Sequence, residues 1–165
     1  MTTIVWDGKT LAADGRMTTG GNKVAEDNRQ KIFIDTVSKL RGATVICYAL
    51  AGSADMVDRV GEWIALGCPH TVESHPYDWG EASFEVIIIT TESTFVYCSE
   101  SNDLLEIFHK TVLGSGGEFA QTALHMGKDA KASVRIAAEM DLFSGGIGTY
   151  INCRTKKLVL KEFQA

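Results

Sequence analysis

The sequence contains few of the residues that break or crosslink a fold. Only two of its 165 residues are proline and four are cysteine, and the cysteines form no Cys-x-x-Cys pair. A disulfide framework or a paired-cysteine zinc site is therefore not expected, and buried reduced thiols are the better interpretation. Hydrophobic residues make up 45% of the chain. This is enough for one core, and a single globular domain is expected over residues 1–165.

A concentrated basic surface and a long apolar run are also missing. The formal net charge is −5, and no long lysine- or arginine-rich cluster offsets it. Nucleic acids and anionic membranes both attract basic surfaces, so neither is expected as a partner. The longest uncharged stretch, residues 42–54, is shorter than a membrane span, and no basic and then apolar leader opens the chain. The protein is expected to be cytoplasmic.

The apolar residues that are present alternate as they do in strands over much of the chain. The first strands are predicted as a hairpin around the turn Asp7-Gly8, a dipeptide that favours tight hairpins. Further strands are predicted at residues 31–39, 43–52, 84–91, 93–99, 148–154 and 156–163. Residues 17–29 and 68–82 are polar and without a period, and both are predicted to be loops.

Three segments are predicted to be helical. In residues 53–67, Met56, Val60 and Trp63 recur at helical spacing, and Ser53 is a suitable N-cap. Two more helices are predicted at 118–127 and 129–143, the second ending at a Ser-Gly-Gly turn. Strands separated by helices without strict alternation favour an α+β layered architecture.

The second residue suggests a specific chemistry. If Met1 is removed, Thr2 carries both a hydroxyl and a free α-amine. An α-amine titrates near pH 7.7 to 8.0 in model peptides, so part of it is neutral at cytoplasmic pH and can accept the hydroxyl proton. Thr2 would then be nucleophile and base at once. A Met-Thr start is common, however, and is informative only in its context.

That context resembles the proteasome β subunits and the bacterial HslV (ClpQ) protease, which are N-terminal-nucleophile hydrolases. The chain has Thr-Thr-Ile-Val at residues 2–5 and Ala-Ala-Asp-Gly-Arg at 12–16, where the family has a Thr-Thr start and a small-small-Asp segment. The resemblance implies a four-layer αββα sandwich, with Thr2 as nucleophile and Asp14 as the buried aspartate. Lys31, after Asn-Arg-Gln, matches the catalytic lysine.

Three later segments extend the resemblance to residue 146. Ala-Gly-Ser-Ala-Asp at 51–55 implies that Gly52 donates to the oxyanion and that the small residues Ser53 and Ala54 line the substrate pocket. Gly-Ser-Gly-Gly at 114–117 implies that Ser115 orients the amine. Asp-Leu-Phe-Ser-Gly-Gly at 141–146 implies supporting roles for Asp141 and Ser144. In related proteins main-chain carbonyls near this turn hold a monovalent or divalent cation, which corresponds here to Ala138, Asp141 and Ser144.

Singly, these residues also have structural interpretations. Asp14 could cap a turn and Lys31 could be a solvated lysine at a strand edge. The Gly-Ser-Gly-Gly segment could cradle a phosphate, although Phe119 stands where a dinucleotide fingerprint needs glycine or alanine. Only the conjunction of the motifs favours the catalytic interpretation.

Two features depart from the family pattern. The unpatterned segment 68–82 leaves no room for the family's second long helix, so one helical layer should be reduced, or covered by an oligomer neighbour. A retained Met1 would block the amine of Thr2.

The resemblance predicts a threonine endopeptidase that cleaves unfolded polypeptides in a homo-oligomeric ring or double ring. It also implies an AAA+ ATPase unfoldase as a possible partner, and no cofactor for catalysis. Two alternatives stay open: a catalytically silent ring that retains Met1, and an amidase acting on small molecules.

Overall fold

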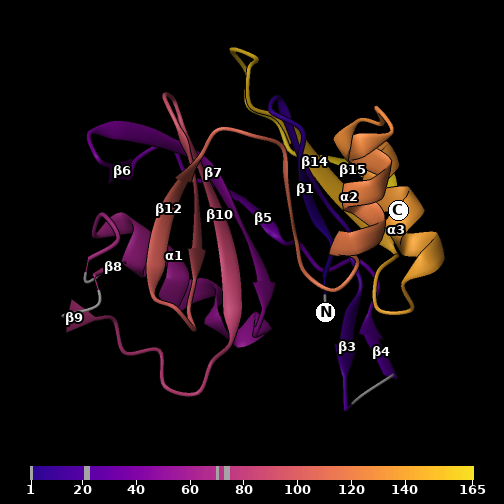
Figure 1. Ribbon diagram of the computed structural model, residues 1–165, viewed down its shortest axis with the longest axis horizontal. Helices are drawn as coiled ribbons and strands as arrows, with labels where there is room; N and C mark the ends of the chain where they lie inside the picture. Colours follow the sequence, from indigo (N-terminus) through magenta and orange to yellow (C-terminus); the bar gives the residue numbers. More distant parts are fainter. Residues whose placement is uncertain (1, 21–22, 70, 73–74) are drawn as a thin grey trace. The chain divides into compact units, whose positions relative to one another are not determined.

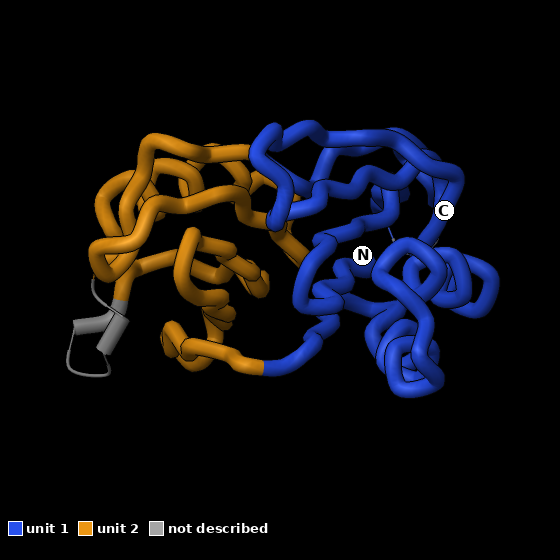
Figure 2. Tube along the Cα trace, turned by 90° about the horizontal axis from the view of Figure 1, so that it is seen from above, with its two compact units in different colours: residues 1–33, 109–165 blue, residues 34–108 orange. Residues whose placement is uncertain are grey.

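The computed structural model describes residues 2–20, 23–69, 71–72 and 75–165. The chain divides into two compact units (Figure 2). The first unit comprises the chain up to Phe33 together with His109–Ala165, and the second comprises Ile34–Phe108. Each unit is built on one main antiparallel sheet, with two α-helices in the first unit and α1 in the described part of the second, as expected for the α+β class.

The first unit is built on a five-stranded sheet in the order β13-β1-β2-β14-β15. Its strands are β1 (Ile4–Trp6), β2 (Thr10–Ala13), β13 (Thr111–Leu113), β14 (Ile147–Asn152) and β15 (Lys161–Gln164). The predicted hairpin joins β1 to β2, because Gly8 supplies a φ of +92° and the Asp7 carboxylate accepts from the N–H groups of Lys9 and Thr10. The predicted strand at 156–163 is shorter, since only its end pairs with β14.

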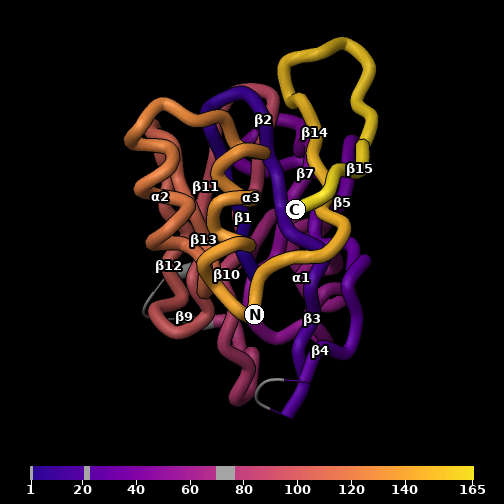
Figure 3. Tube along the Cα trace, turned by 90° about the vertical axis from the view of Figure 1, so that its right-hand side faces the viewer, coloured from indigo at the N-terminus to yellow at the C-terminus, as the bar shows by residue number. Residues whose placement is uncertain are grey.

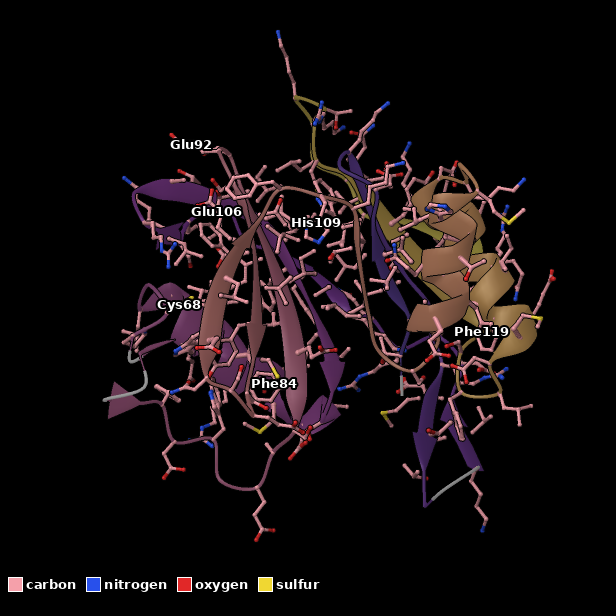
Figure 4. All side chains as sticks on the ribbon, in the orientation of Figure 1. Cys68, Phe84, Glu92, Glu106, His109 and Phe119 are labelled. Carbon is pink, nitrogen blue, oxygen red and sulfur yellow. The ribbon has the colours of Figure 1, made fainter. Side chains whose placement is uncertain are left out.

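Two helices pack on this sheet. Figure 3 shows α2 (Gly117–His125) and α3 (Ala130–Met140) side by side. Asp129 caps α3 by accepting from the N–H of Ala132 at 2.8 Å. Small residues of both helices meet apolar side chains of β1 and β2 in one core: Val5, Ala12, Ala120, Leu124, Ala130, Val134 and Ala137. Alanine at these positions lets the helices approach closely, and Phe119 of α2 packs at the edge of this core (Figure 4).

The prediction of a loop at residues 17–29 was wrong. This segment contains the hairpin of β3 (Met17–Thr19) and β4 (Lys23–Glu26), which pair only with each other (Figure 1). Its strands are largely exposed, so the sequence lacks the apolar alternation that would mark a strand against a core. The backbone ladder, which leaves no mark on side-chain identity, holds the hairpin together.

The second unit is built on a sheet in the order β12-β11-β10-β7-β5, with β6 also paired to β7. Its strands are β5 (Ile32–Ile34), β6 (Lys39–Leu40), β7 (Ala43–Gly52), β10 (Phe84–Thr90), β11 (Thr94–Cys98) and β12 (Asp103–Ile107). The strand predicted at 31–39 is divided between β5 and β6, because the Asp35 carboxylate accepts from the N–H groups of Val37 and Ser38 and forms a turn. Strands β12 and β13 were not predicted.

The helix predicted at 53–67 is present, with a different beginning. A short 3-10 helix, η1 (Ala54–Met56), leads into α1 (Val57–Ala65). Ser53 does not cap it with its side chain. Its hydroxyl instead donates to the carbonyl of Ser83 at 3.2 Å, which ties the helix start to the segment before β10.

Residues 68–82 contain no α-helix among the part that the structure describes, but they are not entirely loop. Two-residue strands β8 (Thr71–Val72) and β9 (His75–Pro76) pair with each other. Among the described residues of this unit, α1 is the one α-helix, so the helical layer is reduced, as expected. An aromatic cluster lies beside it: Trp63, Tyr77, Trp79, Phe84 and Tyr97, with Phe84 at one end of β10 (Figure 4).

The aromatic cluster joins α1 to the sheet and to the segment before β10. The ring centroids of Trp63 and Tyr97 lie 4.5 Å apart, and the rings of Trp79 and Phe84 meet edge to face with their centroids 4.8 Å apart. The indole N–H of Trp79 donates to the Tyr97 hydroxyl at 2.6 Å. Large rings bury much apolar area per residue. The cluster therefore covers sheet surface next to α1.

In the described part of the chain, no helix is long and apolar enough to span a bilayer.

Candidate active site

Asp14 is the centre of a buried polar cluster in the first unit. It directly follows β2 and its side chain is fully buried. Its Oδ1 accepts from the main-chain N–H of Thr3 at 2.8 Å and from Nζ of Lys31 at 2.7 Å. Its Oδ2 accepts from the N–H groups of Arg16 at 3.2 Å and Gly145 at 3.0 Å. A buried carboxylate is tolerated when its oxygens are satisfied in this way.

Lys31 is almost as deeply buried as its partner, with 6% of the residue exposed. Its Nζ also donates to the main-chain carbonyl of Arg16 at 2.7 Å. Burial lowers the pKa of the Lys31 ammonium, and the nearby charge of Asp14 opposes part of that effect. The side chain is therefore a positioned ammonium whose proton is held less firmly than that of a solvated lysine.

Thr2 and Thr3, the two residues immediately before β1, lie at this cluster. Both residues are buried, with 5% and 0% exposed. Lys31 Nζ and the Thr3 nitrogen bind the same carboxylate oxygen of Asp14, so they lie within two hydrogen-bond lengths of each other. Thr2 is the residue immediately before Thr3 in the chain, so it adjoins the Thr3 nitrogen that binds Asp14. Met1, whose removal the predicted chemistry requires, lies outside the described residues.

A second set of side chains continues from Thr3. Its Oγ1 lies 2.6 Å from Oγ of Ser144, which in turn donates to Oδ2 of Asp141 at 2.6 Å. The hydroxyl of Ser115 donates to the same Asp141 oxygen at 2.9 Å. Because Ser144 uses its only proton toward the carboxylate, the Thr3 hydroxyl is the donor to Ser144. Ser115, Asp141 and Ser144, which were predicted from the motifs at 114–117 and 141–146, therefore share one hydrogen-bonded chain.

Glycines allow the elements to meet around these side chains. A Cβ at Gly116 would lie 2.0 Å from Thr3 Oγ1, so no side chain fits there. Gly145 has a φ of +149°, and its N–H donates to Oδ2 of Asp14. Gly146, with a φ of +75°, would place a Cβ 2.2 Å from the carbonyl of Asp27. The motifs of residues 114–117 and 141–146 thus supply close backbone approach as well as side chains.

The other predicted site residues lie elsewhere. Gly52, Ser53 and Ala54 belong to the second unit, at the junction of β7 and η1. Gly52 has a φ of +114°, and a Cβ there would lie 2.4 Å from the carbonyl of Ser83, so glycine is required locally. The structure thus gathers Thr2, Asp14, Lys31, Ser115, Asp141 and Ser144 in the first unit and places these three in the other.

The predicted cation ligands lie at the end of α3. Ala138 is in its last turn and Asp141 is its C-cap, and carbonyls at this end of a helix lack intrahelical partners. Such carbonyls suit a cation chemically, although that of Asp141 already accepts from the N–H of Ser144 at 3.1 Å. In the described part of the chain, no group of three or more His, Cys, Asp or Glu side chains gathers as a metal site.

Four residues of the cluster were not predicted. Thr3, Arg16, Gly116 and Gly145 contribute main-chain groups, a hydroxyl or the absence of a side chain. The tandem threonine was the one available signal for Thr3. Arg16 also pairs with Asp27 at 2.8 Å and donates to the carbonyl of Leu142 at 3.2 Å, which holds the turn after α3 beside β2.

No family model matches this chain, and no curated protein sequence matches it. Among solved structures, it is similar to the crystal structure of eukaryotic HslV from Trypanosoma brucei, with a TM-score of 0.59 and 19% sequence identity. That similarity covers 99% of both chains. At this identity the likeness establishes the fold alone: the chain has a fold of the HslV type.

Proposed function

We propose that this protein is a threonine endopeptidase in which Thr2 is the nucleophile after removal of Met1. One observation carries the proposal. The fully buried Asp14 binds both the Lys31 ammonium and the main chain of Thr3, directly beside Thr2. A buried ion pair adds little to stability compared with apolar packing, so its presence next to the candidate nucleophile favours a chemical role.

The α-amine of Thr2 would act as the base. It accepts the proton of the Thr2 hydroxyl, and Oγ1 attacks the carbonyl carbon of the scissile peptide bond. The tetrahedral intermediate collapses as the C–N bond breaks, and the protonated amine returns its proton to the leaving nitrogen. The ester that remains on Thr2 is hydrolysed by water, with the same amine as base.

Lys31 would stabilise the negative charge that develops on Thr2 Oγ1. Its ammonium is fixed by Asp14 and by the carbonyl of Arg16, so no reorganisation is needed when the alkoxide forms. The positive charge of Lys31 also disfavours a second positive charge nearby, which keeps more of the Thr2 amine neutral. Asp14 limits this effect, because it balances the charge of Lys31.

The remaining assignments rest on the family resemblance. Gly52 would donate its N–H to the oxyanion, and Ser53 and Ala54 would line a substrate pocket for unfolded polypeptide. Ser115, Asp141 and Ser144 would support the amine and hydroxyl of Thr2. Main-chain carbonyls of Ala138, Asp141 and Ser144 would hold a structural cation. Subunits would assemble into a homo-oligomeric ring or double ring in the cytoplasm, supplied by an AAA+ ATPase.

The intact mass of the full-length protein, measured before and after incubation with a peptide epoxyketone, tests this function. We expect loss of the Met1 mass and gain of one inhibitor adduct. Thr2→Ala should give no adduct. Thr122→Ala, which removes the hydroxyl of an exposed threonine on α2, should react like the wild type.

Other outcomes would overturn the proposal in different ways. Retention of Met1 without an adduct would favour a catalytically silent ring. Loss of Met1 without an adduct, together with hydrolysis of small amides but not of fluorogenic peptides, would favour an amidase. Size-exclusion chromatography with light scattering separately tests the ring, since a monomeric mass would exclude it.

A further inference from the structure

Thr3 is the residue through which the two hydrogen-bonded sets of the site are joined. Its main-chain N–H donates to Asp14 at 2.8 Å, and its carbonyl accepts from the N–H of Asp14 at 3.1 Å. Its hydroxyl donates to Ser144, which donates to Asp141. Every polar group of this fully buried residue therefore has a fixed partner.

The hydroxyl of Thr3 has one orientation available to it. Ser144 gives its proton to Asp141, so only its lone pair faces Thr3 and the proton of Thr3 must lie between the two oxygens. Gly116 leaves the space that this hydroxyl fills, because a Cβ at that position would overlap Oγ1 at 2.0 Å. Packing and hydrogen bonding thus fix the same side-chain rotamer.

We propose that Thr3 is a positioning residue whose hydroxyl couples the Asp14–Lys31 pair to the Asp141–Ser144–Ser115 chain and so fixes the adjacent Thr2. The catalytic part of this inference rests on the proposed function. Thr2 is attached to Thr3 by one peptide bond, so rotation of Thr3 would displace the nucleophile relative to Lys31. Errors of about 1 Å in a reacting group are known to reduce rates by about 100-fold.

Thr3→Val tests the proposal because valine keeps the shape and removes the hydroxyl. With a peptide epoxyketone, we expect the maximal inactivation rate to fall about 10-fold to 100-fold. The inhibitor concentration for half-maximal rate should stay unchanged, since Thr3 is fully buried and offers no surface to an inhibitor. Thr3→Ser restores the hydroxyl and should restore the rate to within about 3-fold.

Thr149→Val is the matched control. This threonine is on β14 of the same unit, and its buried hydroxyl has no hydrogen-bond partner among the described residues. The same chemical change there should leave the inactivation rate unaltered.

Circular dichroism and the melting temperature identify any variant that does not fold. If Thr3→Val does not fold, Thr3→Ala, which cannot overpack the site, replaces it.

A second measurement does not depend on activity. The amide of Gly145 is buried and donates to Asp14 Oδ2, whereas Thr3 donates to Oδ1, so hydrogen exchange at Gly145 reports on the cluster through the other carboxylate oxygen. We expect this exchange to be at least about 10-fold faster in Thr3→Val than in wild type or Thr149→Val. Unchanged exchange of Gly145, or an inactivation rate in Thr3→Val equal to that of wild type, would overturn the inference. A wild-type chain that never reacts would overturn only the proposed function, and the exchange result would still decide the coupling.

Discussion

The two units bury clusters of opposite character. In the first, the buried groups around Asp14 are charged or hydroxylic and each is held by directional hydrogen bonds. In the second, the buried groups around Trp63 are aromatic rings, and the indole of Trp79 donates a hydrogen bond to Tyr97. Apolar burial stabilises in proportion to area, whereas a buried ion pair offsets its own desolvation cost. The comparison suggests that the aromatic cluster contributes mainly stability and the polar cluster mainly function.

Removing the central ring should have the largest effect on stability. Trp63→Ala leaves a cavity under α1, and we expect it to lower the free energy of unfolding by about 3–5 kcal/mol in urea denaturation. Phe108→Ala, at a ring that is 88% exposed, should change it by less than about 0.5 kcal/mol. Equal losses in the two variants would show that the aromatic cluster does not carry the stability of its unit.

Neutralising Asp14 should have the second-largest effect on stability and should also affect reactivity. Asp14→Asn leaves the buried Lys31 ammonium without its counter-charge. It also turns an amide N–H toward a group that itself donates, such as the N–H of Gly145. The free energy of unfolding should therefore fall by about 3 kcal/mol. Reaction with the epoxyketone should also be lost. Asp27→Asn removes the half-exposed partner of Arg16 and should cost less than about 1 kcal/mol. An active Asp14→Asn protein would separate this carboxylate from the chemistry.

Two adjacent glycines allow a finer test of the polar cluster. Gly116→Ala drives a methyl group into the Thr3 hydroxyl and should cost about 1–3 kcal/mol in urea denaturation. At Gly117, a Cβ would meet only the Val112 side chain at 3.5 Å, an ordinary contact. Gly117→Ala should therefore be within about 1 kcal/mol of wild type. Similar losses in both variants would mean that helix geometry, and not contact with Thr3, requires glycine there.

The smallest effect expected appears only at alkaline pH. Burial raises the pKa of the Cys68 thiol, beside α1, from 9.0 to about 12. The unfolded chain then loses this proton first, so the stability that Cys68 contributes is complete below pH 9 and falls as the pH rises toward 12. Between pH 7 and pH 10, the free energy of unfolding of Cys68→Ala should therefore fall by about 1 kcal/mol less than that of the wild type. Cys153→Ala, at a half-buried thiol, is the control, and parallel pH profiles for wild type and Cys68→Ala would contradict the prediction.

Prediction from sequence succeeded where local pattern and apolar burial coincide. The hairpin at Asp7-Gly8, the helix over Val60 and Trp63, and the apolar strands β7 and β10 were all expected. It failed where a strand lacks a buried face, as in β3 and β4, or where a side chain interrupts an apolar run, as Asp35 does after β5. Boundaries at Ser53 and Lys161 shifted because pairing partners distant in sequence decide where an element begins.

The sequence by itself determined the α+β class, most elements, and part of the polar cluster: Asp14, Lys31, Ser115, Asp141 and Ser144. These follow from periodicity and from motifs carried by side chains. The tertiary structure alone decided how the motifs act together: Asp14 joins Lys31 to Thr3, Thr3 joins Asp14 to Ser144, and Gly116 gives Thr3 its space. The reason is physical. The bond from Thr3 to Asp14 uses a main-chain N–H, and Gly116 contributes the space left by a missing side chain, so neither is marked by a side-chain pattern. The links of Thr3 to Ser144 and of Asp14 to Gly145 join segments more than one hundred residues apart, which only folding brings within hydrogen-bond distance.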